Sequence, residues 1–417
     1  MFSIANRLFR ERRYEDAIGI YEYLGTLHPE FKQYFINETV ARDLFYGKNR
    51  NTDKYHLEKA SDIQKRLRIA DRLSLDFDRR SMDAFFNPEE VKEYPQILLS
   101  YANAEISTGY GGWLKELNSY LSSHGMAKIG LKAKPSREGG GVFLNITGAS
   151  LEPVTGPLVT ICMSCFNAER YVEHAVRSIL NQSYRNLELL LFNDQSEDGT
   201  LAILERLAKE DVRISLTNNE NNQGTYVSRN QALQRAKGEY FTIMDADDFS
   251  LPDRIARQVS HLAANPDQVG MMTNWVRMKE EGFFVFREAW GGVYEHEAVA
   301  TLMFRTKPVN TAIGYWDSVR FAADTEFLFR MRKKFGYRAV PLMKFPTEIS
   351  LYHDASLTND PITGISAGGI VGLSPVRIKY RKSWTEWHEK VGINHYMPFP
   401  QKNRRFDAPD EMRVKKN

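Results

Sequence analysis

The chain has 417 residues and a formal net charge of +3; 42% of its residues are hydrophobic and 26% are charged. These fractions match those of ordinary soluble globular proteins, which argues against extended disorder, and the small net charge gives no reason to expect a nucleic-acid partner. The length predicts two or three domains.

Neither a membrane span nor a secretory signal is expected. No apolar stretch approaches the roughly 18 residues that cross a bilayer. The first residues, MFSIANRLFRERRYED, become charged too early for a signal peptide. The expected location is the cytoplasm.

Residues 1–150 are predicted to form a mainly α-helical region. Its start resembles one tetratricopeptide-type helical hairpin. An apolar stripe at helical spacing is made there by Leu8, Tyr14, Ala17, Ile18 and Tyr21. A single hairpin cannot bury its own faces, so we expect it to pack on a later helix whose apolar side is Trp113, Leu114, Leu117, Tyr120 and Leu121. The region either packs as core or presents a partner-docking groove. The glycine-rich segment PSREGGGVF then begins a linker that ends near Gly156.

Residues 157–375 are predicted to form an α/β domain, because strands alternate with helices there. The predicted strands are 158–166, 187–194, 212–218 and 240–248, and the predicted helices are 168–180, 200–210, 225–236 and 250–265. We expect Asn167 to cap the first helix, and Ser250 and Asp253 to form a capping box at the start of the last. The alternation predicts a mostly parallel sheet, with ligands at the carboxyl ends of its strands.

Polar side chains follow three of these predicted strands. Ser164 to Asn167 end the first strand, Asp194 ends the second, and Asp245, Asp247 and Asp248 end the fourth. Crowding of like charges at the end of an apolar strand costs free energy unless a cation lies there. Oxygen ligands suit Mg²⁺ or Mn²⁺, which bridge protein carboxylates to diphosphates, so a metal and a diphosphate are expected at this edge.

The segment NNENNQGTYVSRNQAL precedes the fourth strand and adds two further candidates. Gly224 permits a tight turn, and Arg229 follows it in the predicted helix. Arginine near a metal can hold phosphate oxygens by bidentate hydrogen bonds. Arg229 is therefore either a phosphate ligand or a solvent-facing helical residue.

The motifs from VTICMSCFNAERYVEHAV through LLLFNDQSEDGT to GEYFTIMDADD resemble family 2 of the GT-A glycosyltransferases, over about residues 157 to 358. The resemblance implies a Rossmann-like domain, an inverting reaction, and a role in bacterial surface polysaccharide or capsule synthesis. It implies that Ser164, Phe166 and Asn167 hold the nucleotide and that Asp194 reads its base. It also implies that Asp245 lies near the ribose and that Asp247 binds the metal. The chain departs from the family at Asn193, where an acid is common, and at Phe166, where a tyrosine is common.

The segment GYWDSVRFAADTEFLFRMRKKFG resembles the helix on the acceptor side of the family's site. The resemblance places Asp324 as the general base, which the chemistry needs because a sugar hydroxyl must lose its proton as it attacks. Ala323 stands where the family has a glutamate, and Glu326 is a rival base. His353 would complete the metal shell or contact the diphosphate. Trp275 and Trp316 either stack on acceptor sugars or pack in the core.

The expected function is metal-dependent, inverting transfer of a sugar from a nucleotide diphosphate, with a UDP-sugar as the first expectation, to a saccharide or lipid-linked acceptor. The alternatives are a metal-dependent nucleotidyltransferase and a non-catalytic scaffold with a decayed transferase domain. Residues 376–417 are predicted to be a helical, basic tail, either solvated or in contact with the inner face of the cell membrane. Cys162 and Cys165 are expected to pack on opposite faces of a strand, without a redox or zinc role.

Overall fold

The computed structural model describes residues 79–132, 141–286, 293–353 and 374–414, together with a few isolated residues between 8 and 75 and at 356 and 364. The chain forms two compact units. The first consists of Met1–Tyr120, Gly282–Tyr294 and Tyr352–Pro375, and the second of Leu121–Glu281, Glu295–Leu351 and Val376–Asn417.

The described part of the first unit is helical. Asn87 and Glu90 form a capping box at the start of its second described helix, where each side chain accepts a hydrogen bond from the other's backbone N–H. Trp113 is fully buried, donates to the carbonyl of Gly282 at 2.8 Å and stacks on Phe284, so the apolar stripe predicted around it is core. The helices are α6 (Arg79–Phe85), α7 (Pro88–Glu93), α8 (Ile97–Glu105) and α9 (Tyr110–Ser123).

The tetratricopeptide-like start lies mostly outside the described residues. Leu8 and Tyr21 are helical and buried. Tyr14, Ala17 and Ile18 are not described, and so the hairpin remains a prediction.

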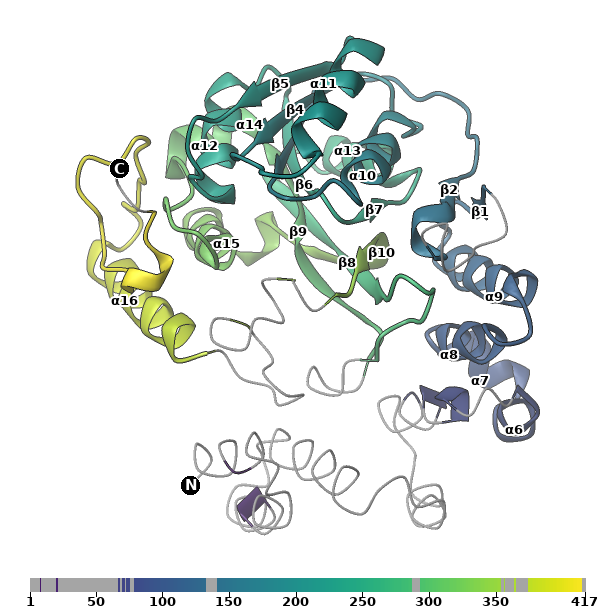
Figure 1. The fold of residues 1–417 in the computed structure, drawn as a ribbon. Helices are drawn as coiled ribbons and strands as arrows, with labels where there is room; N and C mark the ends of the chain where they lie inside the picture. The colour runs from purple at the N-terminus through teal and green to yellow at the C-terminus, as the bar shows by residue number, and fades with distance from the viewer. Residues whose placement is uncertain are drawn as a thin grey trace. The chain divides into compact units, whose positions relative to one another are not determined.

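The second unit is built on an eight-stranded sheet with the order β5-β4-β3-β6-β9-β8-β10-β7. Strands β3, β4, β5, β6, β8 and β10 run in one direction, while β9 and β7 pair antiparallel to their neighbours. This confirms the predicted mostly parallel α/β sheet (Figure 1). The strands are β3 (Val159–Cys165), β4 (Leu187–Asn193), β5 (Ile214–Asn218), β6 (Tyr240–Asp245), β7 (Phe249–Ser250), β8 (Gly270–Met278), β9 (Glu295–Arg305) and β10 (Leu342–Leu351).

Alternate side chains of each central strand enter one of two cores. Cys162 of β3 belongs to the core packed by α12, α14, α15 and α16, whereas Cys165 belongs to the core packed by α10, α11 and α13. Both cysteines are free and buried, as expected for packing residues on opposite faces. The helices are α10 (Val172–Leu180), α11 (Thr200–Glu210), α12 (Thr225–Arg235), α13 (Arg254–Ala264), α14 (Thr306–Ile313), α15 (Ala323–Phe335) and α16 (Pro375–Val391). A small ladder, β1 (Ile129–Leu131) with β2 (Ile146–Gly148), completes the unit.

Two predicted helix starts are wrong. Helix α10 begins at Val172, with Tyr171 and not Asn167 at its N-cap. Helix α13 begins at Arg254, because Ser250 ends strand β7 and Asp253 takes the N-cap position without a side-chain cap bond. In both places tertiary contacts of the polar side chain replace the local cap that its spacing predicted.

The last described α-helix, α16, is not a solvated tail. Tyr380, Trp384 and Trp387 are buried in the same core as α15, so the expectation of a solvated helix is wrong for this face. The aromatic spacing of four and then three residues marks a buried stripe, which the alternating charges obscured. No described helix has the length and apolarity that a bilayer span requires.

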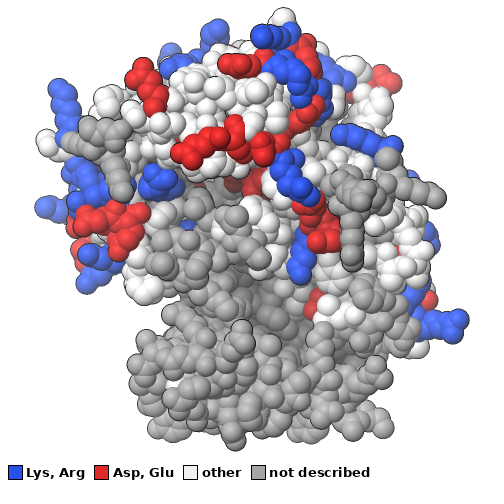
Figure 2. Space-filling view, in the orientation of Figure 1, with Lys and Arg blue, Asp and Glu red and all other residues white. Residues whose placement is uncertain are grey.

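The described surface carries charges of both signs. On the face seen in Figure 2, basic and acidic side chains are interspersed, in keeping with the small net charge. Part of this surface is an ion-pair network between α10 and α11, in which Arg177 and Arg206 each contact Glu173 and Glu210. Such exposed pairs stabilise the fold only modestly.

Candidate active site

The ends of three central strands lie level at one edge of the sheet. In the ladder, Ser164 of β3 lies opposite Asp245 of β6, and Cys165 lies opposite Asn193 of β4. The backbone N–H of Asp194 then donates to the carbonyl of Cys165 at 2.8 Å. The polar residues that follow these strands therefore share one edge, as the sequence predicted.

Arg229 connects helix α12 to this edge. Its Nη2 lies 3.0 Å from Oδ1 of Asp245, and its guanidinium lies over the ring of Tyr226 with 5.1 Å to the centroid. Arg229 is only 6% exposed, so it is not a solvent-facing helical arginine. Of the two interpretations that the sequence left open, the geometry favours the one in which Arg229 belongs to the site.

The carboxylates at the end of β6 are crowded. Burial raises the pKa of Asp245, the charges of Asp247 and Asp324 raise it further, and Arg229 opposes them. The Asp245 side chain is 41% exposed, so solvent moderates this shift. A raised carboxylate pKa reports unfavourable negative charge, which a bound cation would relieve.

Asp245 and Asp247 can hold a hard divalent cation only if a bound substrate supplies further oxygen atoms. Among the described residues, no group of three or more His, Cys, Asp or Glu side chains converges closely enough to hold a metal ion. Mg²⁺ and similar ions are often held by one or two carboxylates together with substrate phosphates, and Asp245 and Asp247 supply such a pair. The donor set therefore fits an ion that binds together with a diphosphate.

Asp248 has a structural role in the same turn. It is 3% exposed, and its Oδ1 accepts the backbone N–H of Leu351 at 2.9 Å. Burial, followed by the charges of Asp247 and Asp245, raises its pKa well above the ordinary value. Asp248 thus ties the aspartate turn to the carboxyl end of β10.

Asp194 holds the loop that leads into α12. Its Oδ1 accepts the N–H of Gln223 and the Nδ2 of Asn219, both at 2.9 Å, and its Oδ2 accepts the N–H of Gly224 at 2.7 Å. Gly224 has a φ of 81°, which favours glycine. Three of the roughly four acceptor positions of a carboxylate are therefore used within the protein, and a base contact at Asp194 remains a prediction.

The residues after β3 form an open, polar rim. Phe166 is 49% exposed and Ser164 is half-buried, and a base contact at either residue remains a prediction. Asn167 has a φ of 47°, and its side-chain oxygen accepts the N–H of Glu197 at 2.9 Å. Asn167 therefore joins the loops after β3 and β4.

Helix α15 brings Asp324 into the electrostatic reach of this edge. Asp324 is half-buried, and its negative charge raises the pKa values of Asp245, Arg229 and Tyr226. Asp324 Oδ1 accepts the N–H of Thr325 at 2.7 Å. The N-cap is Ala322, without a side-chain cap bond, so Asp324 does not cap the helix.

Glu326 is excluded as the base. It is fully buried, and it accepts hydrogen bonds from Arg330 at 2.8 Å and from His388 at 2.9 Å. A carboxylate in this environment cannot reach an acceptor hydroxyl. Asp324 is the acid of α15 whose charge acts on Asp245, and its role as the base remains a prediction.

Three other predicted residues have different outcomes. Trp316 is 1% exposed and stacks on Phe327 at 4.1 Å, so it packs in the core. Trp275 is half-buried, with an edge contact to His296. His353 is half-buried and belongs to the first unit, and its role as a metal or diphosphate ligand remains a prediction.

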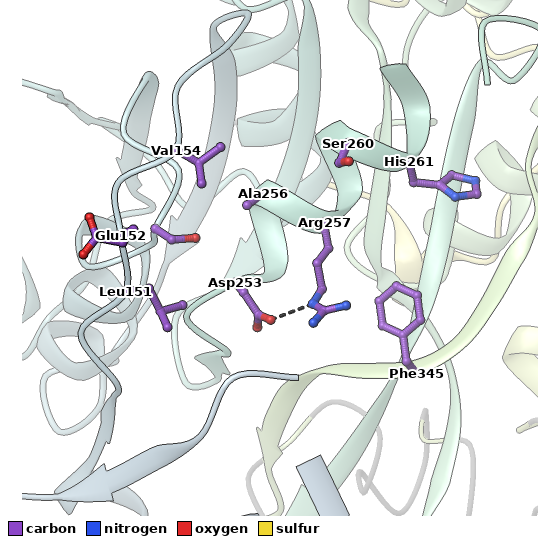
Figure 3. Close-up of a pocket in the computed structure, with 10 residues that line it drawn as sticks. Leu151, Glu152, Val154, Asp253, Ala256, Arg257, Ser260, His261 and Phe345 are labelled. Atoms are coloured by element: carbon purple, nitrogen blue, oxygen red, sulfur yellow. Dashed lines mark hydrogen bonds and ion pairs between the residues drawn. The ribbon is translucent and has the colours of Figure 1, made fainter. Parts of the chain in front are cut away.

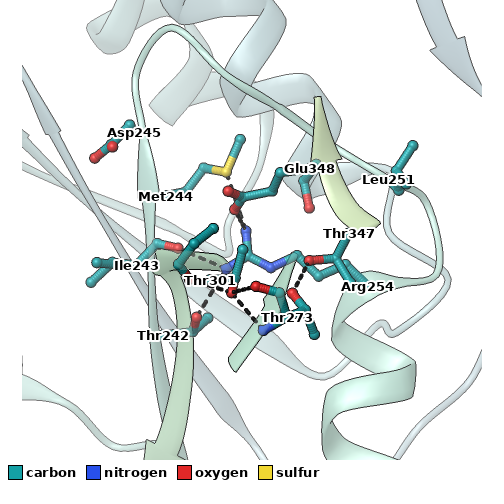
Figure 4. A network of polar contacts seen from close by, with 12 residues as sticks. Thr242, Ile243, Met244, Asp245, Leu251, Arg254, Thr273, Thr301, Thr347 and Glu348 are labelled. Atoms are coloured by element: carbon teal, nitrogen blue, oxygen red, sulfur yellow. Dashed lines mark hydrogen bonds and ion pairs between the residues drawn. The ribbon is translucent and has the colours of Figure 1, made fainter. Parts of the chain in front are cut away.

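A buried ion pair that the sequence did not reveal lies next to β6 (Figure 4). Arg254 contacts Glu348 and donates to Thr242 Oγ1 at 3.1 Å and to the carbonyl of Ile243 at 2.9 Å. Burial raises the pKa of Glu348 to about 7, Arg254 opposes the rise, and Asp245 adds to it. The pair joins α13 and β10 to the strand that ends in Asp245. Since its members lie 94 positions apart, no local pattern could have found them.

A separate pocket of about 590 Å³ lies along α13 (Figure 3). Asp253 accepts a hydrogen bond from Arg257 at 2.6 Å at its rim, and Phe345 and His261 line it further. None of the predicted site residues lines this pocket. It is therefore distinct from the aspartate edge.

Comparison with known proteins finds similarity to glycosyltransferases over the part of the chain that contains this site. The model of the family described as Glycosyl transferase family 2 matches residues 160–332. An uncharacterized glycosyltransferase of Haemophilus influenzae is 34% identical over 161 residues, which are 37% of this chain and 50% of that protein. A protein of Escherichia coli named UDP-Glc:alpha-D-GlcNAc-diphosphoundecaprenol beta-1,3-glucosyltransferase WfgD is 36% identical over 108 residues, 26% of this chain and 42% of that protein.

Among solved structures, S. aureus TarS 1-349 in complex with UDP is similar over 47% of this chain and 61% of its own, at 17% identity and a TM-score of 0.38. The chain spans about half the length of the curated relatives it matches. The matched segment contains the Arg229 and Asp245 pair, Asp247 and Asp324. The similarity to glycosyl transferase family 2 covers residues 160–332, which is less than half of the chain.

Proposed function

We propose that this chain transfers a sugar from a nucleotide diphosphate to the hydroxyl of a saccharide or lipid-linked acceptor, with inversion at the anomeric carbon and with help from Mn²⁺ or Mg²⁺. The observation that carries the proposal is the grouping of Arg229, Asp245, Asp247 and Asp324 at one edge of the sheet of the second unit. This edge combines a fixed cation, a metal-binding pair and a carboxylate that can accept a proton. Inverting transfer needs charge stabilisation of the leaving diphosphate and removal of the acceptor proton, and these groups can supply both.

The leaving group is a nucleoside diphosphate, and its negative charge grows as the sugar departs. Arg229 is buried, charged and held by Asp245, so it can stabilise a phosphate oxygen without moving. A divalent ion held by Asp245 and Asp247 would supply further charge neutralisation when bound. His353 is proposed as an additional metal or diphosphate ligand.

Asp324 is proposed to accept the proton of the attacking hydroxyl. Its Oδ1 is occupied by the N–H of Thr325, so Oδ2 is the oxygen assigned to the acceptor. A single displacement with the base on the acceptor side gives inversion, because the hydroxyl attacks the face opposite the diphosphate.

The donor is proposed to be a UDP-sugar and the acceptor a lipid-linked or polymeric saccharide. The printed name of the E. coli relative, a UDP-Glc transferase that acts on a sugar diphosphoundecaprenol, supports both assignments. The exposed ring of Phe166, beside Ser164 and Asn167, is proposed to stack on the base. Asp194 is proposed to contact the same base. A lipid-linked acceptor would bring the protein to the inner face of the cell membrane.

A panel of nucleotide sugars tests the proposal. Thermal stability and nucleotide release would be measured with each donor, with Mn²⁺, with Mg²⁺ and with EDTA. We expect one UDP-sugar to stabilise the protein only in the presence of metal, and an acceptor to accelerate release of UDP. Release of pyrophosphate would instead identify a nucleotidyltransferase, and the absence of binding by any donor would support a scaffold.

A further inference from the structure

Helix α16 lies outside the residues matched by the family and packs against α15, the helix that carries Asp324 (Figure 1). Lys333 of α15 contacts the carbonyl of His388, and the rings of Phe329 and Trp384 lie 5.4 Å apart. The side chains of Trp384 and Trp387 are buried in this contact. The C-terminal segment is therefore part of the packing around α15.

The contact contains a buried polar cluster made by Glu326, Arg330 and His388. Glu326 Oε1 accepts from Nε of Arg330 at 2.8 Å and lies 2.9 Å from Nε2 of His388. Glu326 Oε2 accepts Nη2 of Arg330 at 2.9 Å. Burial would raise the pKa of Glu326, yet Arg330 and His388 hold it below the ordinary value, so the carboxylate is ionised and paired.

Arg330 extends the cluster to the loop after α14. It contacts the carbonyl of Ile313, and its Nη2 donates to the carbonyl of Tyr315 at 2.7 Å. Arg330 is fully buried, so removal of any partner would leave charge or a polar group uncompensated in the core. Such a cluster keeps one orientation of α15.

The start of α15 needs this external support. Ala322 at the N-cap has a φ of 68°, a left-handed conformation that is costly for alanine, and no side chain caps the helix. Asp324 lies in this uncapped first turn, and Glu326 lies two residues further on. The bond between Glu326 and His388 ties this part of α15 to α16 at 2.9 Å.

We propose that Glu326, Arg330 and His388 position Asp324, and that α16 thereby completes the catalytic centre from outside the family segment. The inference rests on the proposed function, because it assumes that Asp324 acts on the acceptor. His388 is a positioning residue: within the described part of the chain it contacts Glu326 and the rings around it, but neither the aspartate edge nor Arg229, and it acts through Glu326. The first turn of α15 is the element through which it acts.

The rest of the C-terminal segment supports the neighbouring part of the site. The hydroxyl of Tyr380 donates to Asp317 at 3.0 Å, and the N–H of Arg320 donates to the carbonyl of Met412 at 2.8 Å. A Cβ at Gly224 would lie 3.4 Å from Cα of Arg320, so the Gly224 turn rests on this backbone. The C-terminal segment therefore supports both α15, which carries Asp324, and the Gly224 turn, which leads to Arg229.

The test compares His388→Leu with His388→Gln in the full chain. Leucine removes the hydrogen-bond partner of Glu326, whereas the amide of glutamine can donate to Glu326 from the position of Nε2. Donor affinity would be measured by calorimetry with the nucleotide sugar identified in the donor panel, and kcat and KM by nucleotide release. We expect His388→Leu to lower kcat by on the order of 10²-fold, the cost of misplacing a catalytic group, with an unchanged donor dissociation constant. His388→Gln should restore most of kcat.

His395→Phe is the matched control. His395 is 1% exposed, its ring lies 5.1 Å from that of His388, and neither of its nitrogens has a hydrogen-bond partner among the described residues. This variant changes the same core without touching Glu326, so kcat should be retained. The inference is overturned if folded His388→Leu keeps full kcat, if glutamine fails to rescue it, or if His395→Phe loses kcat equally. Absence of transfer by the wild type would instead contradict the proposed function.

Discussion

Arg229 and Asp245 form an ion pair at 3.0 Å, in which the arginine is almost wholly buried and the aspartate is partly open to solvent. The buried partner is fixed by the stacked ring of Tyr226, and the open partner faces the edge where three strands end. A cation held in this way is preorganised for a phosphate oxygen, since it needs no rearrangement when the charge develops.

Replacement of Arg229 by lysine should therefore impair transfer although it keeps the charge. Lysine cannot stack as a plane on Tyr226 or bridge Asp245 and a phosphate. We expect kcat/KM to fall on the order of 10²-fold. Arg235→Lys, at the exposed end of the same helix, is the control and should retain wild-type kinetics. Equal kinetics for the two variants would remove Arg229 from the site.

Replacement of Asp247 by alanine should abolish the metal dependence of donor binding. A lost ligand should cost at least as much as a lost outer-shell partner, roughly 10²-fold in metal affinity. Calorimetry of the donor with and without Mn²⁺ measures this, with Glu205→Ala on the exposed face of α11 as control. If Asp247→Ala still binds the donor more tightly with Mn²⁺ than with EDTA, the metal assignment is wrong.

The two cysteines should be inert in the native protein. Both are fully buried; burial raises the pKa of Cys162 to about 12 and the pKa of Cys165 beyond that. Thiolate is the reactive form, so labelling by a thiol reagent at neutral pH should be negligible until denaturant is added, when both thiols should react. Rapid labelling of the folded chain would restore a redox or metal role for the pair.

His395 should make the protein less stable in mild acid. Burial lowers its pKa to about 4, with the positive charges of His388, Lys333 and Arg330 adding to the effect. Below pH 6.5 His395 binds a proton in the unfolded chain, whereas in the folded chain it binds one only near pH 4. The contribution of neutral His395 to stability is therefore present above pH 6.5 and is lost as the pH falls from 6.5 to about 4. Each pKa unit corresponds to about 1.4 kcal/mol.

Denaturant unfolding of wild type and His395→Phe at pH 7.5 and pH 5 checks this. The wild type should lose more unfolding free energy on acidification than the variant does. Parallel losses in the two proteins would show that His395 titrates normally.

The strands and the edge they share could be predicted because they depend on local pattern. Buried strands appear as apolar runs, and the carboxyl ends of parallel strands must meet at one edge. Ser164 accordingly lies opposite Asp245, and Cys165 lies opposite Asn193. The prediction that Cys162 and Cys165 lie on opposite faces of the sheet followed from the two-residue period of a strand alone.

Contacts between distant segments could not be predicted. The bond of Asp194 to Gly224, the pair of Arg254 with Glu348, and the binding of Glu326 by His388 depend on which elements become neighbours in the folded chain. The caps predicted at Asn167 and Ser250 do not form, for the same reason. Asn167 accepts a hydrogen bond from the loop after β4, and Ser250 accepts one from Gln182. Local spacing does not report such competition.

Asp324→Asn is the variant that tests the account most directly. The amide keeps the size of the side chain and can still accept the N–H of Thr325, but it cannot take a proton from the acceptor. Donor binding by calorimetry and transfer by nucleotide release should be measured on the same preparation. We predict an unchanged donor dissociation constant and a loss of transfer on the order of 10²-fold to 10⁴-fold; full turnover by this variant would contradict the assignment of the base and with it the proposed catalytic centre.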